Sequence, residues 1–484
     1  MKLKNLLQDV RVRELRADPE LEITDIAYDS RKVRPGGLFV AITGFASDGN
    51  RFIPMAMDRG AAVIVTTKRP VLEVPYVLVE SDRLALALLS ANFFGHPARS
   101  MTMVGITGTN GKTSVSLLLK QVLEDALGAK VGLIGTMGTL IGDEPLETER
   151  TTPESYELQK LFARMRDAGC THVVMEVSSH ALVLDRVCGI HYDVAAFTNL
   201  TEDHLDFHKT MDAYCDAKAE LFARCHKAVI NSDDLYAERM LAKAAGEVLT
   251  FSAKRTDTTV FAGTPELHAR GVHFTAFSGH RGVDVRMRIP GRFTVYNALT
   301  VLTVAKALGI PMEQAALSLG KAKGVKGRVE VVPTPGMPYT ILIDYAHTPD
   351  GLENVLRSVR DFCRGRVIAV FGCGGDRDPI KRPIMGKIGV KLSDFAVITS
   401  DNPRTEEPVA IIEDILRGIT DSMGSYAVVP DRRTAIRYAM DIAKKDDIIV
   451  LAGKGHEDYQ EINGVKYHLD EREEVAAYLA ELRG

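Results

Sequence analysis

A glycine-rich stretch at residues 108–114 constrains this chain more than any other part of its sequence. It follows residues 103–107, an apolar run that predicts a buried strand, and precedes 115–126, whose apolar periodicity predicts a helix. Glycines allow backbone N–H groups to approach phosphate oxygens, and the N-terminus of a helix adds partial positive charge. Strand, glycine loop and helix in this order therefore predict a site for a nucleoside triphosphate.

The loop also supplies side chains with defined chemistry. Lys112 is expected to reach the β- and γ-phosphates, and a hydroxyl from Thr113 or Ser114 to bind Mg²⁺. The match to G-x-x-x-x-G-K-[ST] is imperfect, because Ile106 stands where the first glycine would fall. The flanking strand and helix support the assignment, since a chance Gly-Lys-Thr lacks them.

Length and composition restrict the class of protein. A chain of 484 residues is long enough for about three domains. The six cysteines form no C-x-x-C pair, which favours free thiols and a reducing compartment. The net charge of −4 gives no reason to expect nucleic-acid or membrane binding. With no long apolar run and no signal-peptide core, we expect a cytoplasmic protein and a monomer.

The predicted elements divide the chain into three α/β parts. About a hundred residues precede the glycine loop, which predicts a separate N-terminal domain over residues 1–98. Residues 99–330 alternate strands and helices, as a mostly parallel sheet requires, and 331–484 repeat this pattern as a Rossmann-like domain. The strands are expected at 23–28, 37–42, 62–66, 76–79, 103–106, 172–177, 194–198, 228–231, 340–343, 367–371, 395–399 and 448–451. Hairpins are expected over 260–289, and further helices at 83–94 and 295–308.

Polar residues at strand ends are candidates for the site, because α/β sheets place ligands there. Glu176 ends one predicted strand of the middle part and is a natural second ligand for Mg²⁺. His204 and His208 are four apart and could form a zinc pair on one helical face. No H-E-x-x-H pattern or nearby thiolate accompanies them, so a core or solvated histidine is the plainer interpretation of each.

The loops of the third part carry charges of both signs, which suits a zwitterionic ligand but also a solvated rim. These residues are Asp344, His347, Arg377, Lys381, Arg382, Asp401, Arg404, Lys454, His456 and Glu457. The glycines at 372–375 lack the G-x-G-x-x-G spacing, so no nicotinamide site is expected.

A series of motifs, in this order along the chain, resembles the Mur ligase family. They are TGTNGKTS (107–114), MEVSSH (175–180), TNLTEDHLDFH (198–208), YCDAKAELF (214–222), GRFTVYN (291–297), GVKGRVE (324–330), DYAHTPD (344–350) and DNPR (401–404). The resemblance covers essentially the whole chain. It implies an ADP-forming ligase that activates the D-glutamyl γ-carboxylate of a UDP-N-acetylmuramoyl dipeptide as an acyl phosphate and joins it to meso-2,6-diaminopimelate. Such a ligase serves peptidoglycan synthesis and, through the cell wall, cell shape and division.

The resemblance also assigns a role to Lys218, which on sequence alone is an exposed lysine. The family carbamylates this lysine with CO₂, which converts an ammonium that repels Mg²⁺ into an oxygen ligand. Glu176 and His204 are implied to share that second Mg²⁺ with it. Lys112, Glu176, His204 and Lys218 are thus the implied catalytic residues.

Further binding residues follow residue by residue from the matching motifs. Those implied for ATP are Gly108, Thr109, Asn110, Gly111, Lys112, Thr113, Ser114, Asn297, Arg328 and Asp344. Those implied for the UDP-linked substrate are Ser30, Phe45, Ala46, Ser47, Thr151, Thr152, Ser178 and Arg186. Those implied for diaminopimelate are Arg377, Asp401, Asn402, Pro403, Arg404, Gly453 and Glu457. The family often has His-Gln-Ala at 45–47 and Gln at Leu184, so those side-chain hydrogen bonds are lost here.

The DNPR motif implies diaminopimelate rather than lysine. Diaminopimelate has a distal carboxylate that the planar fork of Arg404 can hold in two hydrogen bonds. With lysine, Arg404 and Arg377 would face a cavity without a partner. Leaving each group unpaired costs about 1–3 kcal/mol. Asp401 and Glu457 are expected to take the distal ammonium.

Several alternatives stay open at this point. A lysine-adding relative differs only in the amino acid. Folylpolyglutamate synthetase shares the GTNGKT core but has neither the leading domain nor DNPR. A P-loop regulator would not need the charged loops of the third part, and a metabolite kinase would release no free phosphate.

Overall fold

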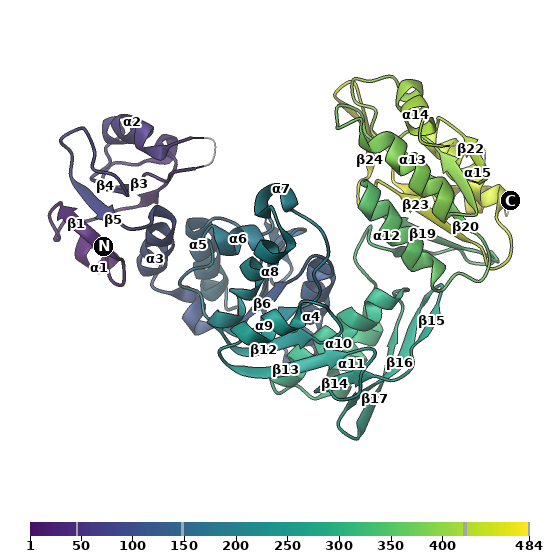
Figure 1. The fold of residues 1–484 in the computed structure, drawn as a ribbon, viewed down its shortest axis with the longest axis horizontal. Helices are drawn as coiled ribbons and strands as arrows, with labels where there is room; N and C mark the ends of the chain where they lie inside the picture. Colours follow the sequence, from purple (N-terminus) through teal and green to yellow (C-terminus); the bar gives the residue numbers. More distant parts are fainter. Residues whose placement is uncertain (45–46, 147–149, 420–423, 483–484) are drawn as a thin grey trace. The chain divides into compact units, whose positions relative to one another are not determined.

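A computed structural model describes residues 1–44, 47–146, 150–419 and 424–482. The chain forms two compact units, Met1–Phe261 with Leu299–Ala315 and Ala262–Ala298 with Ala316–Gly484. Both units are α/β. Three larger, mostly parallel sheets run through them, one for each part of the expected three-domain α/β fold, which is confirmed (Figure 1). No described helix is long and apolar enough to cross a membrane.

The first sheet has the strand order β1-β5-β4-β3-β2, and only the β1–β5 pair is antiparallel. Its strands are β1 (Val12–Arg16), β2 (Ile26–Ala27), β3 (Leu38–Val40), β4 (Val63–Thr66) and β5 (Tyr76–Val79). Its helical segments are α1 (Leu3–Leu6), η1 (Ser30–Lys32), η2 (Gly49–Phe52), α2 (Ile53–Asp58), α3 (Asp82–Phe93) and η3 (Pro97–Ser100). The sequence analysis missed β1, because this exposed edge strand is rich in charged residues.

The second sheet places the glycine loop between parallel strands. Within the first unit its order is β14-β13-β12-β11-β6-β10-β7-β8-β9, parallel from β14 to β7. The strands are β6 (Thr102–Thr107), β7 (Val131–Gly135), β8 (Gly138–Ile141), β9 (Glu144–Leu146), β10 (His172–Glu176), β11 (Tyr192–Phe197), β12 (Cys225–Asn231), β13 (Glu247–Ser252) and β14 (Val260–Ala262). Strand β6 is central, so the loop that follows it emerges between the ends of β10 and β11.

Helices lie between the strands of this sheet, and the first of them covers the helix predicted at 115–126. They are α4 (Lys112–Leu127), α5 (Ser155–Asp167), α6 (Ser179–Val183), α7 (Leu205–His208), α8 (Met211–Ala219), η4 (Phe222–Arg224) and α9 (Ala237–Lys243). The chain passes between the units within α10 (Arg292–Ala307) and α11 (Met312–Lys321). Helix α10 confirms the prediction at 295–308, and Gly309 follows it with φ +79° as a helix stop.

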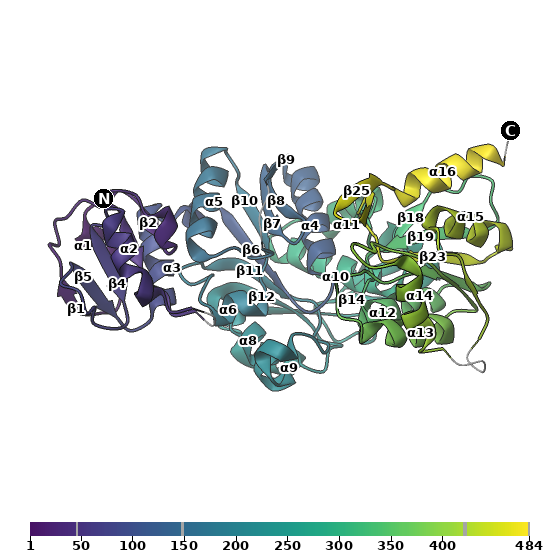
Figure 2. The same ribbon diagram turned by 90° about the horizontal axis from the view of Figure 1, so that it is seen from above.

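The second unit contains the expected hairpin strands and a six-stranded sheet of order β18-β19-β23-β20-β21-β22. Its strands are β15 (Glu266–His268), β16 (Gly271–Ser278), β17 (Arg281–Met287), β18 (Glu330–Val332), β19 (Thr340–Asp344), β20 (Val367–Phe371), β21 (Phe395–Ile398), β22 (Tyr426–Val428), β23 (Ile448–Ala452), β24 (Tyr459–Ile462) and β25 (Val465–His468). Its helices are α12 (Pro349–Arg360), α13 (Lys381–Leu392), α14 (Pro408–Leu416), α15 (Arg432–Ile442) and α16 (Glu471–Glu481). Helices α12–α14 cover one face and α15–α16 the other, each over its own apolar core (Figure 2).

Candidate active site

The glycine loop is fixed by the segment that follows β11. Gly108 has φ +149°, and a Cβ there would lie 1.9 Å from Thr198 Oγ1, so only glycine fits. Asn110 N donates to Asn199 Oδ1 at 3.0 Å, and Thr198 Oγ1 donates to Asn110 O at 2.6 Å. Gly111, with φ +87°, precedes α4 directly. The loop therefore has the backbone conformation and helix N-terminus that favour phosphate binding.

Lys112 lies across this loop. It is the first residue of α4, and its Nζ donates to Gly108 O at 2.9 Å and Thr109 O at 2.8 Å. Thr113 and Ser114 are half-buried in the same helical turn. The contacts of these side chains with phosphates and Mg²⁺ stay predictions.

The carboxylate of Glu176 lies beside the loop. Glu176 ends β10 in register with Ile106 of β6, and it is 1% exposed. Thr136 donates to both carboxylate oxygens, from N to Oε1 at 3.0 Å and from Oγ1 to Oε2 at 3.0 Å. A Cβ on Gly135 would lie 2.3 Å from Oε1, so the strand end is shaped around the carboxylate.

Lys218 of α8 is buried rather than exposed, so the plain interpretation of this residue as a surface lysine is wrong. It is 1% exposed, and Nζ donates to Gly108 O at 2.8 Å. Its Nζ lies 4.6 Å from the centre of the Tyr214 ring. Burial and the nearby charge of Lys112 hold the pKa of the Lys218 amine well below its usual value.

Histidines gather next to this site, but His204 and His208 do not form a zinc pair on one helical face. His204 has φ +54° and precedes α7, so it does not share a helical face with His208. Its ring centre is 5.0 Å from that of His180. His208 Nε2 lies 2.8 Å from Ser179 Oγ, and burial lowers the pKa of His208 to about 4. Within the described ranges no three His, Cys, Asp or Glu side chains are arranged to hold a metal ion.

The residues implied for the muramoyl dipeptide come together. Thr152 Oγ1 donates to Glu176 O at 2.7 Å and accepts from Ser178 N at 3.1 Å. Arg186 Nη1 donates to Thr152 O at 3.2 Å, and Thr151 Oγ1 lies 3.1 Å from Thr136 Oγ1. Through Thr136, which also donates to Glu176, this cluster adjoins the Glu176 carboxylate.

The residues implied for the UDP end are less connected. Ser30 begins η1, is 5% exposed, and its Oγ donates to Met55 Sδ at 3.3 Å. Ser47 is exposed, whereas Phe45 and Ala46 lie outside the described residues.

The residues implied for adenosine belong to the second unit. Asp344 ends β19 and accepts a 2.8 Å hydrogen bond from Val329 N, while burial raises the pKa of its carboxyl. Arg328 is exposed, with its guanidinium 5.4 Å from the centre of the Tyr345 ring. Asn297 comes from α10 and is 7% exposed.

The DNPR motif follows β21 and meets the loop after β23. Asn402 Nδ2 donates to Glu457 Oε2 at 2.9 Å, and Lys454 Nζ donates to Asn402 Oδ1 at 3.1 Å. Gly453 has φ +118°, and a Cβ there would lie 2.4 Å from Asp401 Oδ2. The loops after β21 and β23 thus meet at one end of the sheet, and the role of Asp401 and Glu457 there stays a prediction.

Part of the Arg404 guanidinium is hydrogen-bonded within the protein, which was not expected from the sequence. Its Nε donates to Glu461 Oε2 at 3.2 Å and its Nη1 to Gly375 O at 2.7 Å. Gly375 belongs to the loop that also carries Arg377, which is exposed. Arg404 and Arg377 therefore come to the same end of the sheet, beside Pro403.

Sequence comparisons place this geometry in a known family. Residues 22–92 match the catalytic domain of the Mur ligase family, 106–305 the Mur ligase middle domain and 327–455 the glutamate ligase domain. A UDP-N-acetylmuramoyl-L-alanyl-D-glutamate–2,6-diaminopimelate ligase of Clostridium tetani is 47% identical over 490 residues, covering 100% of both chains. The chain belongs to the Mur ligase family. A ligase of the same name from Listeria monocytogenes is 43% identical to it, covering 98% of both chains.

Solved structures agree with the Mur ligase assignment. A structure of a UDP-N-acetylmuramoyl-L-alanyl-D-glutamate–2,6-diaminopimelate ligase has a TM-score of 0.79 at 30% identity, covering 100% of this chain and 99% of that one. Folylpolyglutamate synthase of Mycobacterium tuberculosis has a TM-score of 0.59 at 18% identity, covering 83% of this chain and 95% of that one. The second likeness shows a common fold alone.

Sequence reasoning missed a group of arginines around one carboxylate of this Mur ligase. Glu154 accepts from Arg150 at 3.0 Å, pairs with Arg186 at 2.9 Å and reaches Arg83 at 3.5 Å. Arg186 Nε is buried and has no hydrogen-bond partner among the described residues. Of this group the sequence analysis had named only Arg186, and Arg83 comes from α3, far away in the sequence.

Thr136→Val is expected to lower kcat of this Mur ligase by about tenfold, because one of the two hydrogen bonds that orient Glu176 is lost. Thr139→Val is a matched control on the neighbouring strand. Thr139 Oγ1 is buried and without a partner in the described chain, so valine there should keep kcat and the melting temperature or raise the latter. Phosphate release and thermal melting measure both variants, and equal kcat values would show that Thr136 does not orient the carboxylate.

Proposed function

We propose that this Mur ligase joins meso-2,6-diaminopimelate to the γ-carboxylate of the D-glutamyl residue in UDP-N-acetylmuramoyl-L-alanyl-D-glutamate, with ATP converted to ADP and phosphate. The full-length similarity to ligases of that name carries the proposal. The assembly of Asp401, Asn402, Arg404 and Glu457 at one sheet end supports the choice of amino acid. The reaction belongs to peptidoglycan precursor synthesis in the cytoplasm.

The reaction needs an activated carboxyl group, because a carboxylate is a poor electrophile at neutral pH. The γ-carboxylate oxygen attacks the γ-phosphorus of ATP, the bond to ADP breaks, and an acyl phosphate forms. The amine of diaminopimelate then attacks the acyl carbon, a tetrahedral intermediate forms, and phosphate leaves as the amine proton is lost. Lys112, held over the glycine loop, stabilises the negative charge that develops on the transferred phosphoryl group.

The residues around the loop fit Mg²⁺. A hydroxyl of Thr113 or Ser114 and the buried carboxylate of Glu176 are oxygen donors, which this cation prefers. When bound, Mg²⁺ neutralises phosphate charge. An unmodified Lys218 would oppose a second ion near His204, whereas its carbamate would be a further oxygen ligand.

The environment of Lys218 supports the carbamate. Carbamate formation needs a neutral amine, and the lowered pKa makes this form available where an exposed lysine is protonated. The amine attacks CO₂, one N–C bond forms and one proton leaves.

The remaining assignments place each substrate on its own set of residues. Asn297, Arg328 and Asp344 contact the adenosine. Ser30 and the 45–47 segment contact the UDP group, and Thr151, Thr152, Ser178 and Arg186 hold the muramoyl dipeptide. Arg377 and Arg404 bind the distal carboxylate of diaminopimelate, Asp401 and Glu457 its ammonium, with Asn402, Pro403 and Gly453 shaping the pocket. Residues 1–98, 99–330 and 331–484 are the corresponding domains of a monomer.

Phosphate release from ATP tests the proposal. With the UDP-linked dipeptide, Mg²⁺ and bicarbonate present, we expect release with meso-diaminopimelate and little with L-lysine or without an amino acid. Release with lysine would preserve the ligase and refute the specificity. No release with either would refute the proposed function, and a folate acceptor with glutamate would then test the folate-type alternative.

A further inference from the structure

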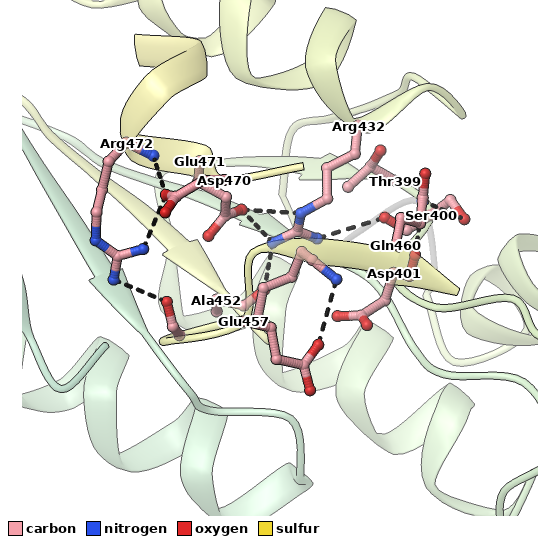
Figure 3. Close-up of polar contacts among 12 residues, drawn as sticks. Thr399, Ser400, Asp401, Arg432, Ala452, Glu457, Gln460, Asp470, Glu471 and Arg472 are labelled. Atoms are coloured by element: carbon pink, nitrogen blue, oxygen red, sulfur yellow. Dashed lines mark hydrogen bonds and ion pairs between the residues drawn. The ribbon is translucent and has the colours of Figure 1, made fainter. Parts of the chain in front are cut away.

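A buried arginine joins the two strand ends that carry the amino-acid site. Arg432 begins α15 and is 0% exposed. Its Nη2 donates to Ala452 O at 2.9 Å and its Nη1 to Ser400 O at 3.4 Å. Ala452 ends β23 next to Gly453, and Ser400 directly precedes Asp401. Figure 3 shows the Arg432 side chain reaching from its helix to the chain on either side.

The charge of Arg432 is balanced by a buried glutamate. Glu471, the first residue of α16, is 0% exposed, and its Oε1 accepts from Arg432 Nε at 2.9 Å and pairs with Nη2 at 2.7 Å. Its Oε2 is buried and has no hydrogen-bond partner among the described residues. A buried ion pair with incomplete hydrogen bonding contributes little to stability compared with apolar side chains. Stability alone is therefore a poor explanation for these charges.

The same cluster contains the carboxylates proposed for the substrate ammonium. Asp401 is 6% exposed, and its carboxylate accepts no hydrogen bond from the part of the chain that the structure describes. Lys454 is 0% exposed and pairs with Glu457 at 3.3 Å. Arg432 interacts electrostatically with Asp401, Glu457 and Glu471. Two cations thus face three carboxylates, which leaves one negative charge for one ammonium group.

We propose that Arg432 is a positioning residue for the amino-acid substrate and that Glu471 sets the charge of the cluster. The guanidinium fixes the carbonyls of Ser400 and Ala452, and so holds Asp401 against Gly453. The net negative charge of the cluster selects a substrate that brings an ammonium to this end of the sheet. This inference rests on the proposed function and extends it to residues that no substrate atom needs to touch.

Two substitutions change the geometry and the charge of the cluster one at a time. Arg432→Lys keeps the positive charge, but an ammonium cannot span Ser400 O, Ala452 O and Glu471 as a planar fork does. Glu471→Gln keeps the shape and removes one negative charge. We expect each substitution to raise KM for meso-diaminopimelate about tenfold, with kcat and KM for ATP within about twofold of wild type.

The control is Arg437→Lys. Arg437 lies on the same helix and pairs with Glu474 and Glu481 of α16, so it also joins the two helices. It makes no contact with either strand end among the described residues, and its variant should keep both KM values. If the three substitutions acted only by loosening α15 from α16, each variant would have a lower melting temperature. The ratio of KM for diaminopimelate to KM for ATP would then stay at its wild-type value.

The outcomes are distinct. Parallel rises in both KM values, or an unchanged KM for diaminopimelate in a folded variant, overturn the inference. If Arg432→Lys does not fold, the isosteric Glu471→Gln decides by the same ratio, and failure of both to fold assigns the pair to folding alone. Calorimetric titration with meso-diaminopimelate distinguishes failure of the inference about Arg432 from failure of the proposed function. A wild-type protein that binds no diaminopimelate refutes that function, whereas equal binding by wild type and variants refutes only the role of Arg432.

Discussion

Lys218→Met is expected to lower diaminopimelate-dependent phosphate release by about 10³-fold, because the proposed carbamate, and the oxygen ligand that it would supply, could no longer form. The substitution keeps most of the buried volume, so the fold should survive. Burial and the nearby charge of Lys112 lower the pKa of this amine, so its removal should cost little stability that depends on charge. Phosphate release with saturating ATP and bicarbonate measures the loss.

Lys243→Met is the matched control, because Lys243 is a surface lysine of the same unit paired with Glu220. It should retain wild-type activity. Native intact-mass measurements with and without bicarbonate should show one added CO₂ in wild type and Lys243→Met but none in Lys218→Met. Acidification below the folded pKa of Lys218 protonates the amine, so the added mass and the activity should fall together. An unmodified, fully active wild-type protein would disprove the carbamate.

Arg404→Ala is expected to raise KM for meso-diaminopimelate about 10²-fold and to leave KM for ATP within about twofold of wild type. The distal carboxylate loses a charge-assisted fork, and lysine, which has no such carboxylate, should lose much less. The preference for diaminopimelate over lysine, measured as the ratio of kcat/KM values, should therefore narrow. Arg404→Lys should be nearly as impaired, because an ammonium cannot replace the planar fork.

The internal bond of Arg404 to Glu461 needs its own control, since alanine leaves that carboxylate unpaired. The double variant Arg404→Ala with Glu461→Gln removes the orphaned charge. If it regains wild-type KM for diaminopimelate, Arg404 acts only by neutralising Glu461. Arg417→Ala, which removes a surface ion pair with Asp414, should change neither KM.

The sequence predicted the buried strands, because each of them is a run of apolar residues. Strands β6, β10, β19 and β23 are fully or largely buried and were located within one or two residues. Strand β1 was missed because its residues face solvent. The glycine loop was located from residue types alone, because few sequences other than a phosphate loop place Gly-Lys-Thr between a strand and a helix.

The buried charges could not be predicted in this way. Charged residues usually mark the surface, so the burial of Lys218, Arg432 and Glu471 has no local signature. Lys218 was singled out only by resemblance to a family, and Arg432 was not singled out at all. Their partners lie tens of residues away in sequence, and only the three-dimensional fold brings them together.

One carbonyl oxygen, that of Gly108, accepts hydrogen bonds from both Lys112 and Lys218. Lys218, which would bind CO₂, and Lys112, which would bind the nucleotide, therefore donate to the same acceptor and interact electrostatically. The unmodified Lys218 amine competes with Lys112 for the Gly108 carbonyl. A carbamate at Lys218 would instead carry a negative charge that attracts the Lys112 ammonium, and would hold Lys112 more firmly at the loop. If the proposed carbamate forms, dissolved CO₂ would therefore be required together with ATP before the reaction could begin.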